Sequence, residues 1–283
     1  MSTIVFLHAH PDDEASQTSG SMARAVAEGH RVVTVFATNG DHGELPAEGL
    51  PEGETLVHWR RREAQASAAV LGVQRIAWLG YADSGMTGWE QNTADGAFLV
   101  ADLDEAAQRL VAVLDEEDAD VLVGYDGHGG YGHPDHVKAH HVAHRAADLA
   151  ATRPRLLEST FNRDQMRYVY QAAVASGQGD AAFDPDQPQD DGNPMGTPEA
   201  QIDWQVDVRA YLPQRRASLE AHRSQASDIE MLLGIPAEPF AAMFGVEHYI
   251  EPGLHRPGAH EGGMRIGWPF EAVLDRSAHT YQQ

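Results

Sequence analysis

The sequence predicts an α/β protein of the Rossmann-like class, in which a doubly wound, mostly parallel sheet is followed by a more elaborate C-terminal part. In the first half of the chain, short apolar runs alternate with segments of helical periodicity. Strands separated by such helices favour right-handed βαβ crossovers and a parallel sheet. The apolar runs are rich in β-branched residues, which is typical of strands buried on both faces. We expect a single domain over residues 1–283.

Four apolar runs are the expected strands: 3–9, 31–38, 75–80 and 120–125. Four segments that follow them are the expected helices: 14–28, 56–71, 101–116 and 134–151. Gly29 and Gly72 end the first two helices, because glycine readily takes the left-handed conformation that closes a helix. Pro134 begins the fourth helix at a position that proline favours.

The second half of the chain gives fewer signals. Residues 176–201 are rich in Gly, Pro and Asp, which predicts a long irregular loop. A helix is expected over 215–228 and a late strand over 246–252. We therefore expect a catalytic core in residues 1–150 and a C-terminal elaboration in residues 151–283.

The composition excludes several kinds of partner and site. The chain has 43 acidic and 20 basic residues, and the resulting net charge of -23 opposes binding to nucleic acid or to an anionic membrane surface. We expect a small-molecule substrate instead, and a homo-oligomer is compatible with the sequence. The chain has no cysteine, so any metal must be held by His, Asp or Glu. It also lacks a basic leader and any run of about 18 apolar residues, which predicts a cytoplasmic protein.

Two similar motifs follow expected strands: HPDD at 10–13 and HPDH at 133–136. In the strand order 3-2-1-4, the first and fourth strands are neighbours where the order reverses, and ligands bind outside their carboxyl ends. The two motifs should therefore face each other across one crevice. Each places a histidine near a helix N-cap and a proline at the first helical position, so residues three apart point to the same side.

This spacing predicts a metal site. A catalytic zinc takes three protein ligands, commonly histidine nitrogens and a carboxylate, and keeps a position for water. His10, Asp13 and His136 would supply such a set. His8 is a rival for His10, because residues two apart share a strand face, although a supporting or core position is expected for it. Zinc is favoured, and Fe2+, Co2+ or Ni2+ would fit the same donors.

The other polar residues of the motifs are candidates for proton transfer. Asp12 is left free to act as a general base, and His133 as an acid or an oxyanion partner. Asp135 could orient His133, as carboxylates do for catalytic histidines. Farther along, His140 and His144 recur at helical spacing. They could suggest a second metal, but a partly buried polar face is the expected role.

The two motifs together resemble the PIG-L/LmbE-like family, whose members are mostly zinc-dependent N-deacetylases of N-acetylglucosamine-containing substrates. The stretches that carry the resemblance are HAHPDDE near the N-terminus, RRREAQASAAVLGV at 60–73, LGYADSGM at 79–86 and GGYGHPDH at 129–136. The resemblance is closest to the mycothiol-pathway branch. It implies the same assignments as the spacing, with metal ligands His10, Asp13 and His136 and proton-transfer residues Asp12, His133 and Asp135.

The resemblance also implies roles that the spacing does not. Tyr131 matches a mobile family tyrosine that polarises the amide carbonyl. Arg60 and Asp83 match positions that hold inositol and sugar hydroxyls. His222 lies in a segment similar to the family's AHxSQ-type sequence near the pocket, which makes it a candidate substrate contact.

Three functions are compatible with these residues. The leading one removes the acetyl group from an N-acetylglucosamine conjugate such as an acetylglucosaminyl-inositol. The second is an amidase that cuts a larger acyl group from mycothiol S-conjugates, with the same catalytic residues and a pocket set by loops 40–58, 84–100 and 176–201. The third is a sugar- or metal-binding protein without turnover, which predicts a broken motif, whereas both motifs are complete.

Overall fold

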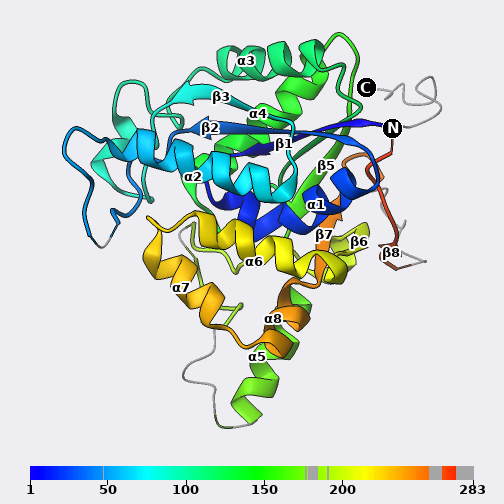
Figure 1. The fold of residues 1–283 in the computed structure, drawn as a ribbon. Coiled ribbons are helices and arrows are strands. Elements are labelled where there is room, and N and C mark those ends of the chain that lie inside the picture. The colour runs from blue at the N-terminus through cyan, green and yellow to red at the C-terminus, as the bar shows by residue number, and fades with distance from the viewer. Residues whose placement is uncertain (47, 176, 178–183, 190, 255–262, 272–283) are drawn as a thin grey trace.

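The computed structural model describes residues 1–46, 48–175, 177, 184–189, 191–254 and 263–271. Within these residues the chain forms one mixed sheet of eight strands with helices on both faces (Figure 1). The strands are β1 (Thr3–His8), β2 (Arg31–Thr38), β3 (Arg75–Tyr81), β4 (Val121–Tyr125), β5 (Arg155–Thr160), β6 (Trp204–Asp207), β7 (Val246–Ile250) and β8 (Arg265–Ile266). Their order in the sheet is β3-β2-β1-β4-β5-β7-β6-β8.

The five strands from β3 to β5 in the sheet order are parallel, which confirms the predicted doubly wound core. β1 lies between β2 and β4, and β2 pairs with β3, so the predicted order 3-2-1-4 is confirmed. β5 extends the parallel part beyond β4. β7 then runs antiparallel to both β5 and β6, and the short β8 pairs with β6 in parallel.

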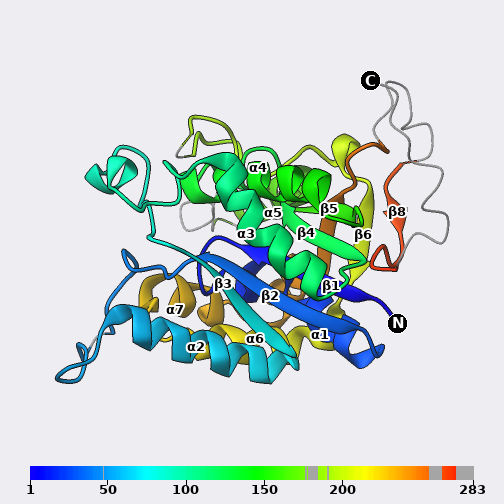
Figure 2. The same cartoon turned by 90° about the horizontal axis from the view of Figure 1, so that it is seen from above.

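The helices form a layer on each face of the parallel strands. They are α1 (Ser19–Ala27), α2 (Leu56–Leu71), α3 (Leu103–Glu116), α4 (Pro134–Leu149), α5 (Arg163–Ala175), α6 (Leu212–Ala221), α7 (Ala226–Gly234) and α8 (Ala237–Phe244). α3 and α4 cover one face, and α1, α2 and α6 lie on the other (Figure 2). None of the helices in the described part of the chain has the length and apolar character that a bilayer-spanning segment needs.

The first predicted helix, 14–28, differs from the observed one at its start. It begins with a π-helical turn, η1 (Glu14–Thr18), and continues as α1. Such turns are rare and often lie at functional sites. This one directly follows the HPDD motif and buries the Glu14 side chain in the interior.

The helix predicted over 215–228 is two helices in the structure, α6 and α7, with a break at His222. The break has a chemical cause. His222 contacts a buried carboxylate, and the Ser224 backbone N–H donates to Glu63 Oε1 at 2.8 Å instead of continuing the helical ladder. Buried carboxylates therefore compete successfully with helix propensity at this point.

The rest of the C-terminal half was predicted only in part. The late strand at 246–252 is confirmed as β7, whereas β5, β6, β8, α5 and α8 were not predicted. The described parts of 176–201 are irregular, as expected, apart from the 3₁₀ turn Glu199–Gln201. Residues 176, 178–183 and 190 of that segment lie outside the described residues.

The sheet brings the two motifs to one edge. Ile4 pairs with Val121 in the parallel register, so β1 and β4 end side by side. His8 is the last residue of β1 and Tyr125 the last of β4, and each motif follows its strand. The predicted juxtaposition of the two loops is therefore confirmed.

Glu117, just after α3, joins the beginnings of two strands. Its carboxylate accepts hydrogen bonds from Arg31 of β2 (2.5 and 3.0 Å) and from Arg75 of β3 (2.7 Å). These bonds, above all those from Arg31, lower the pKa of Glu117 from 4.5 to about 2. A carboxylate with a depressed pKa stabilises the fold above its unfolded pKa, and this contribution is lost as the pH falls toward its folded pKa.

We expect Glu117→Gln to lower the free energy of unfolding by about 2 kcal/mol at pH 7, because charge-assisted hydrogen bonds are lost. The difference from wild type should shrink at pH 3, and urea unfolding at the two pH values measures it. Glu116→Gln is the matched control, because the more exposed Glu116 carboxylate pairs with Arg75 alone and should contribute less than about 0.5 kcal/mol. An equal loss for Glu117→Gln at both pH values would contradict the argument.

Candidate metal centre and active site

The HPDD motif follows β1 and forms a strained turn. Asp12 has a φ of 112°, a conformation that residues with a side chain rarely adopt. Its backbone N–H donates to Glu14 Oε2 (2.9 Å), while Arg60 donates to the Pro11 carbonyl and to Asp12 Oδ2 (3.0 Å). Backbone strain of about 1–3 kcal/mol persists only where surrounding contacts fix the conformation, and such positions cluster at active sites.

The HPDH motif begins α4. Pro134 is the first helical residue, and His133 caps the helix, because its Nδ1 accepts the Asp135 backbone N–H at 3.1 Å. Since Nδ1 accepts, the hydrogen of the neutral ring is on Nε2, which becomes a donor. In the preceding loop, Gly129 has a φ of 67°, and a Cβ there would lie 2.4 Å from His136 Cβ. This close approach requires glycine.

The two motifs form one buried cluster of imidazole rings. The ring centroids lie 4.6 Å apart for His10 and His133, 4.9 Å for His133 and His136, and 5.4 Å for His10 and His136. One nitrogen from each ring lies within 4.8 Å of one from each of the others. Such a group of buried nitrogens is a candidate metal site.

The Asp13 carboxylate faces the lone pair of a histidine of this cluster. His136 Nδ1 lies 3.0 Å from the Gly129 carbonyl, which can only accept, so Nδ1 carries the ring hydrogen. His136 Nε2 then points its lone pair at Asp13 Oδ1, 3.2 Å away, and has no hydrogen-bond partner among the described residues. Two buried electron-pair donors in contact need a positive charge between them. With His10 beside them, the donor set fits a divalent metal ion.

Tyr125 holds the Asp13 carboxylate and was missed by sequence reasoning. Its hydroxyl donates to Asp13 Oδ2 at 2.7 Å and accepts the Ala9 backbone N–H at 2.9 Å. The His10 backbone N–H donates to the same carboxylate oxygen at 2.8 Å. The signal was a tyrosine at the end of an apolar strand, because its hydroxyl needs a polar partner at the sheet edge.

Burial separates the titration of the two proton-transfer candidates. Burial raises the pKa of Asp12 to about 6, against the opposing charge of Arg60. Burial lowers the pKa of His133 to about 2, and the charges of His10 and His136 act in the same direction. A carboxylate with a pKa near 6 suits proton acceptance at neutral pH, and a neutral imidazole suits hydrogen-bond donation.

The Asp135 carboxylate does not contact His133 as expected. Its Oδ2 lies 3.2 Å from His10 Nε2 and accepts the Ser84 backbone N–H at 2.9 Å, so only the Asp135 backbone reaches the His133 ring. Asp83, expected at the substrate, is also buried and lies 3.5 Å from His10 Nε2. Both carboxylates therefore surround His10.

Arg60 is buried and contacts the HPDD loop. Arg60 is 2% exposed, and its Nη1 donates to the Gly40 carbonyl at 2.8 Å while Nη2 contacts Asp12. These contacts indicate that Arg60 orients the Asp12 carboxylate. They favour this role for Arg60, and not the expected contact with sugar hydroxyls. Tyr131 lies beside the imidazole cluster, with its ring centroid 4.9 Å from that of His136.

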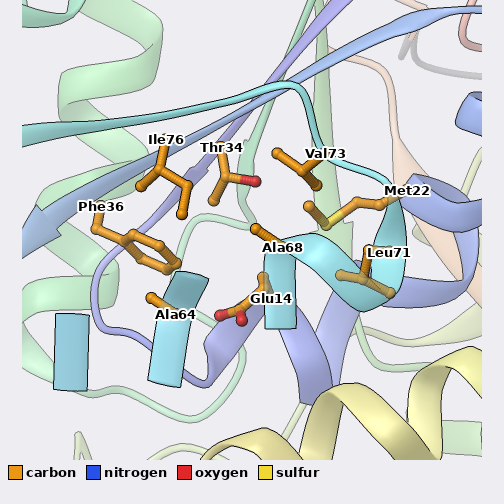
Figure 3. Close-up of a pocket in the computed structure, with 9 residues that line it drawn as sticks. All are labelled: Glu14, Met22, Thr34, Phe36, Ala64, Ala68, Leu71, Val73 and Ile76. Atoms are coloured by element: carbon orange, nitrogen blue, oxygen red, sulfur yellow. The ribbon is translucent and has the colours of Figure 1, made fainter. Parts of the chain in front are cut away.

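Glu14 is a buried carboxylate behind the site, and its role was also missed. Its Oε1 accepts hydrogen bonds from His222 Nε2 (2.7 Å) and Ser67 Oγ (2.6 Å). Its Oε2 accepts a hydrogen bond from the Asp12 backbone N–H. Figure 3 shows it among mostly apolar side chains between α2 and the sheet. Burial by itself raises the pKa of Glu14, but His222 and Ser67 outweigh it and bring the pKa down to about 2. Glu14 is thus a charged link from α2 and α6 to Asp12.

His222, the expected candidate for a substrate contact, lies buried behind the site. His222 is 0% exposed, and its ring is engaged by the buried carboxylate of Glu14. The neighbouring Gln225 accepts the Glu44 backbone N–H and donates to the Glu44 carbonyl, both at 3.1 Å. The AHxSQ-type segment therefore ties the turn between α6 and α7 to the motif and to the loop after β2.

The site is a Rossmann-like sheet with histidine and carboxylate groups that could hold a metal ion at the ends of β1 and β4. The family model described as PIG-L: GlcNAc-PI de-N-acetylase matches residues 5–147, half of the chain. The chain belongs to the PIG-L family, as the motifs predicted.

Relatives extend the match over nearly the whole chain. Identity is 37% to the 1D-myo-inositol 2-acetamido-2-deoxy-alpha-D-glucopyranoside deacetylase of Thermobispora bispora, over 94% of each chain. It is 34% to the protein of the same name from Salinispora arenicola, over 97% of this chain and 94% of that one. The solved structure of N,N'-diacetylchitobiose deacetylase from Pyrococcus horikoshii matches with a TM-score of 0.54 and 20% identity, over 88% of this chain and 82% of that one, which supports the fold.

We expect His222→Ala to lower the free energy of unfolding by about 3–5 kcal/mol, because it leaves the buried Glu14 carboxylate without its charged partner. Ser67→Ala is the graded control, since it removes a neutral donor and should cost about 1–2 kcal/mol. Urea unfolding measures both. A raised KM with an unchanged free energy of unfolding would instead mean that His222 binds substrate.

Proposed function

We propose that the chain is a metal-dependent N-deacetylase that hydrolyses the acetamide of an N-acetylglucosamine conjugate, with an acetylglucosaminyl-inositol as its leading substrate. The two full-length relatives bear the name of that deacetylase, which supports the substrate. The observation that carries the chemistry is the contact between His136 Nε2 and Asp13 Oδ1, beside the Asp12 carboxylate that Arg60 holds.

In this proposal His10, Asp13 and His136 hold the ion. His133 belongs to the same imidazole cluster, but its Nδ1 already accepts a hydrogen bond and its Nε2 carries the ring hydrogen. It is therefore the poorest metal ligand of the three histidines. Zinc is the ion we favour, since two imidazoles and a carboxylate with room for water are its usual catalytic set. The chemistry supplied by such an ion is Lewis acidity, which makes water a nucleophile near neutral pH.

The remaining residues handle protons and charge. Asp12, oriented by Arg60, takes a proton from the water that attacks the acetamide carbonyl carbon. Negative charge develops on the carbonyl oxygen, which accepts hydrogen bonds from His133 Nε2 and from the Tyr131 hydroxyl. The tetrahedral intermediate then loses the amine, which takes up the proton held by Asp12, and acetate is released.

A cavity beside the HPDH motif supports a conjugate larger than a simple sugar. It has a volume of about 360 Å³ and is lined by Thr87, Asn92, Leu99, Gly132, Pro134, Val137, Lys138, His141 and Asp191. Gly132 and Pro134 flank His133 in the chain. Of the loops expected to set the substrate size, 84–100 and 176–201 contribute lining residues and 40–58 contributes none. We propose that a non-reacting part of the substrate binds there, although none of the proposed metal ligands or proton-transfer residues lines this cavity.

We expect Asp12→Asn to lower kcat by about 10²–10⁴-fold and His133→Ala by about 10²–10³-fold, because the first removes a base and the second an oxyanion donor. Elemental analysis should find the same metal content as in wild type. Asp148→Asn, at the far end of α4, is the control and should be fully active. Wild-type turnover in either metal-loaded variant would disprove the assigned roles.

The second test concerns metal and substrate together. Dialysis against a chelator should abolish acetate release from acetylglucosaminyl-inositol, and added Zn2+ should restore it. Under the same conditions a bulky mycothiol S-conjugate should be cleaved more slowly. Faster cleavage of the S-conjugate would favour the amidase, and a metal-loaded protein inactive on both would favour a binding protein.

A further inference from the structure

α4 carries a second group of potential metal ligands, one turn beyond those of the catalytic centre. His140 and His144 lie on successive turns with ring centroids 4.4 Å apart. Glu158 of β5 points its Oε1 at both rings, 2.5 Å from His144 Nε2 and 3.4 Å from His140 Nδ1. One ligand atom from each of the three residues lies within 4.8 Å of the others.

The hydrogen bond of His140 prepares it to bind a metal. Its Nδ1 lies 3.0 Å from the Tyr125 carbonyl, which can only accept, so the lone pair of the neutral ring is on Nε2. Metal-binding histidines usually donate their other ring N–H to a carbonyl or carboxylate in this way. His136 has the same arrangement with the Gly129 carbonyl. The two turns share this carbonyl contact, although His136 directs Nε2 at Asp13 whereas His140 approaches Glu158 through Nδ1.

The environment of Glu158 favours a cation. Its side chain is 9% exposed, and its ion pairs within the described residues are with His140 and His144. Both partners are imidazoles, and neither is an arginine or a lysine. A buried carboxylate with only such partners lacks a permanent counter-charge. The His144 side chain is 36% exposed, which gives an ion a path from solvent.

Tyr125 separates this cluster from the catalytic centre. Its hydroxyl binds Asp13, whereas its backbone carbonyl binds His140. His136 and His140 are one helical turn apart, about 6 Å along the axis of α4. The two groups share no ligand, so they can be occupied independently.

We propose that His140, His144 and Glu158 form a second metal site, distinct from the catalytic one, that takes a divalent transition ion such as zinc, cobalt or nickel. Two imidazoles and one carboxylate suit these ions and not Mg2+ or Ca2+, which prefer oxygen ligands. An ion there cross-links α4 to β5 and so braces the helix that carries His133 and His136. The site leaves positions open to water, and we expect its ion to exchange more readily than the buried catalytic one.

Equilibrium dialysis of the full chain against micromolar Zn2+, followed by elemental analysis, tests this proposal. Wild type should bind two ions per chain. His144→Ala and Glu158→Gln should each bind one, and His136→Ala should keep one while losing activity. His141→Ala is the matched control, because its ring is next to His140 but outside the ligand set, and it should keep two.

The outcomes separate the second site from the proposed function. One ion in wild type, or two in His144→Ala, overturns the second site and leaves the catalytic assignment untouched. One ion in His136→Ala and none in the His136→Ala/His144→Ala double variant supports the second site even if no acetamide substrate is turned over. Circular dichroism confirms that each variant is folded before its ions are counted.

Discussion

The charge on Glu14 is the constraint on which the site depends. A buried carboxylate costs several kcal/mol unless it is paired and fully hydrogen-bonded. His222, Ser67 and the Asp12 backbone N–H must therefore all be in place around it, although His222 is 208 positions away in the chain. The packing of α2 and α6 over the sheet is in this way coupled to the backbone of Asp12, the proposed base. Helices that look like a scaffold belong to the active site.

The same loop divides two adjacent aspartates between different tasks. Asp13 turns inward, where Tyr125 and the His10 backbone fix its carboxylate against His136. Asp12 turns the other way and meets Arg60. Neighbouring carboxylates repel each other, so their separation lowers the cost of keeping both charged. In the proposed mechanism Asp13 would hold the metal ion and Asp12 would exchange a proton.

The sequence predicted what depends on local signals. Alternating apolar runs and glycine stops were enough for the parallel core, and the His-Pro motifs were enough to bring His10 and His136 together. Side-chain partners were harder, because they depend on distant segments. Asp135 faces His10 instead of its near neighbour in sequence, and Arg60 and His222 turn from the expected substrate toward the HPDD loop. β5 was missed because a glutamate interrupts its short apolar pattern.

The positive φ of Asp12 limits how this loop can vary between relatives. Glycine and asparagine adopt such a backbone most easily, and neither carries a negative charge. The replacements that would relax the turn are therefore those that remove the Asp12 carboxylate, the proposed base. A descendant of this protein could lose hydrolysis at one position and gain stability in the same step, with its metal ligands and fold intact. Such a chain would keep the proposed metal ligands and lack the proposed base.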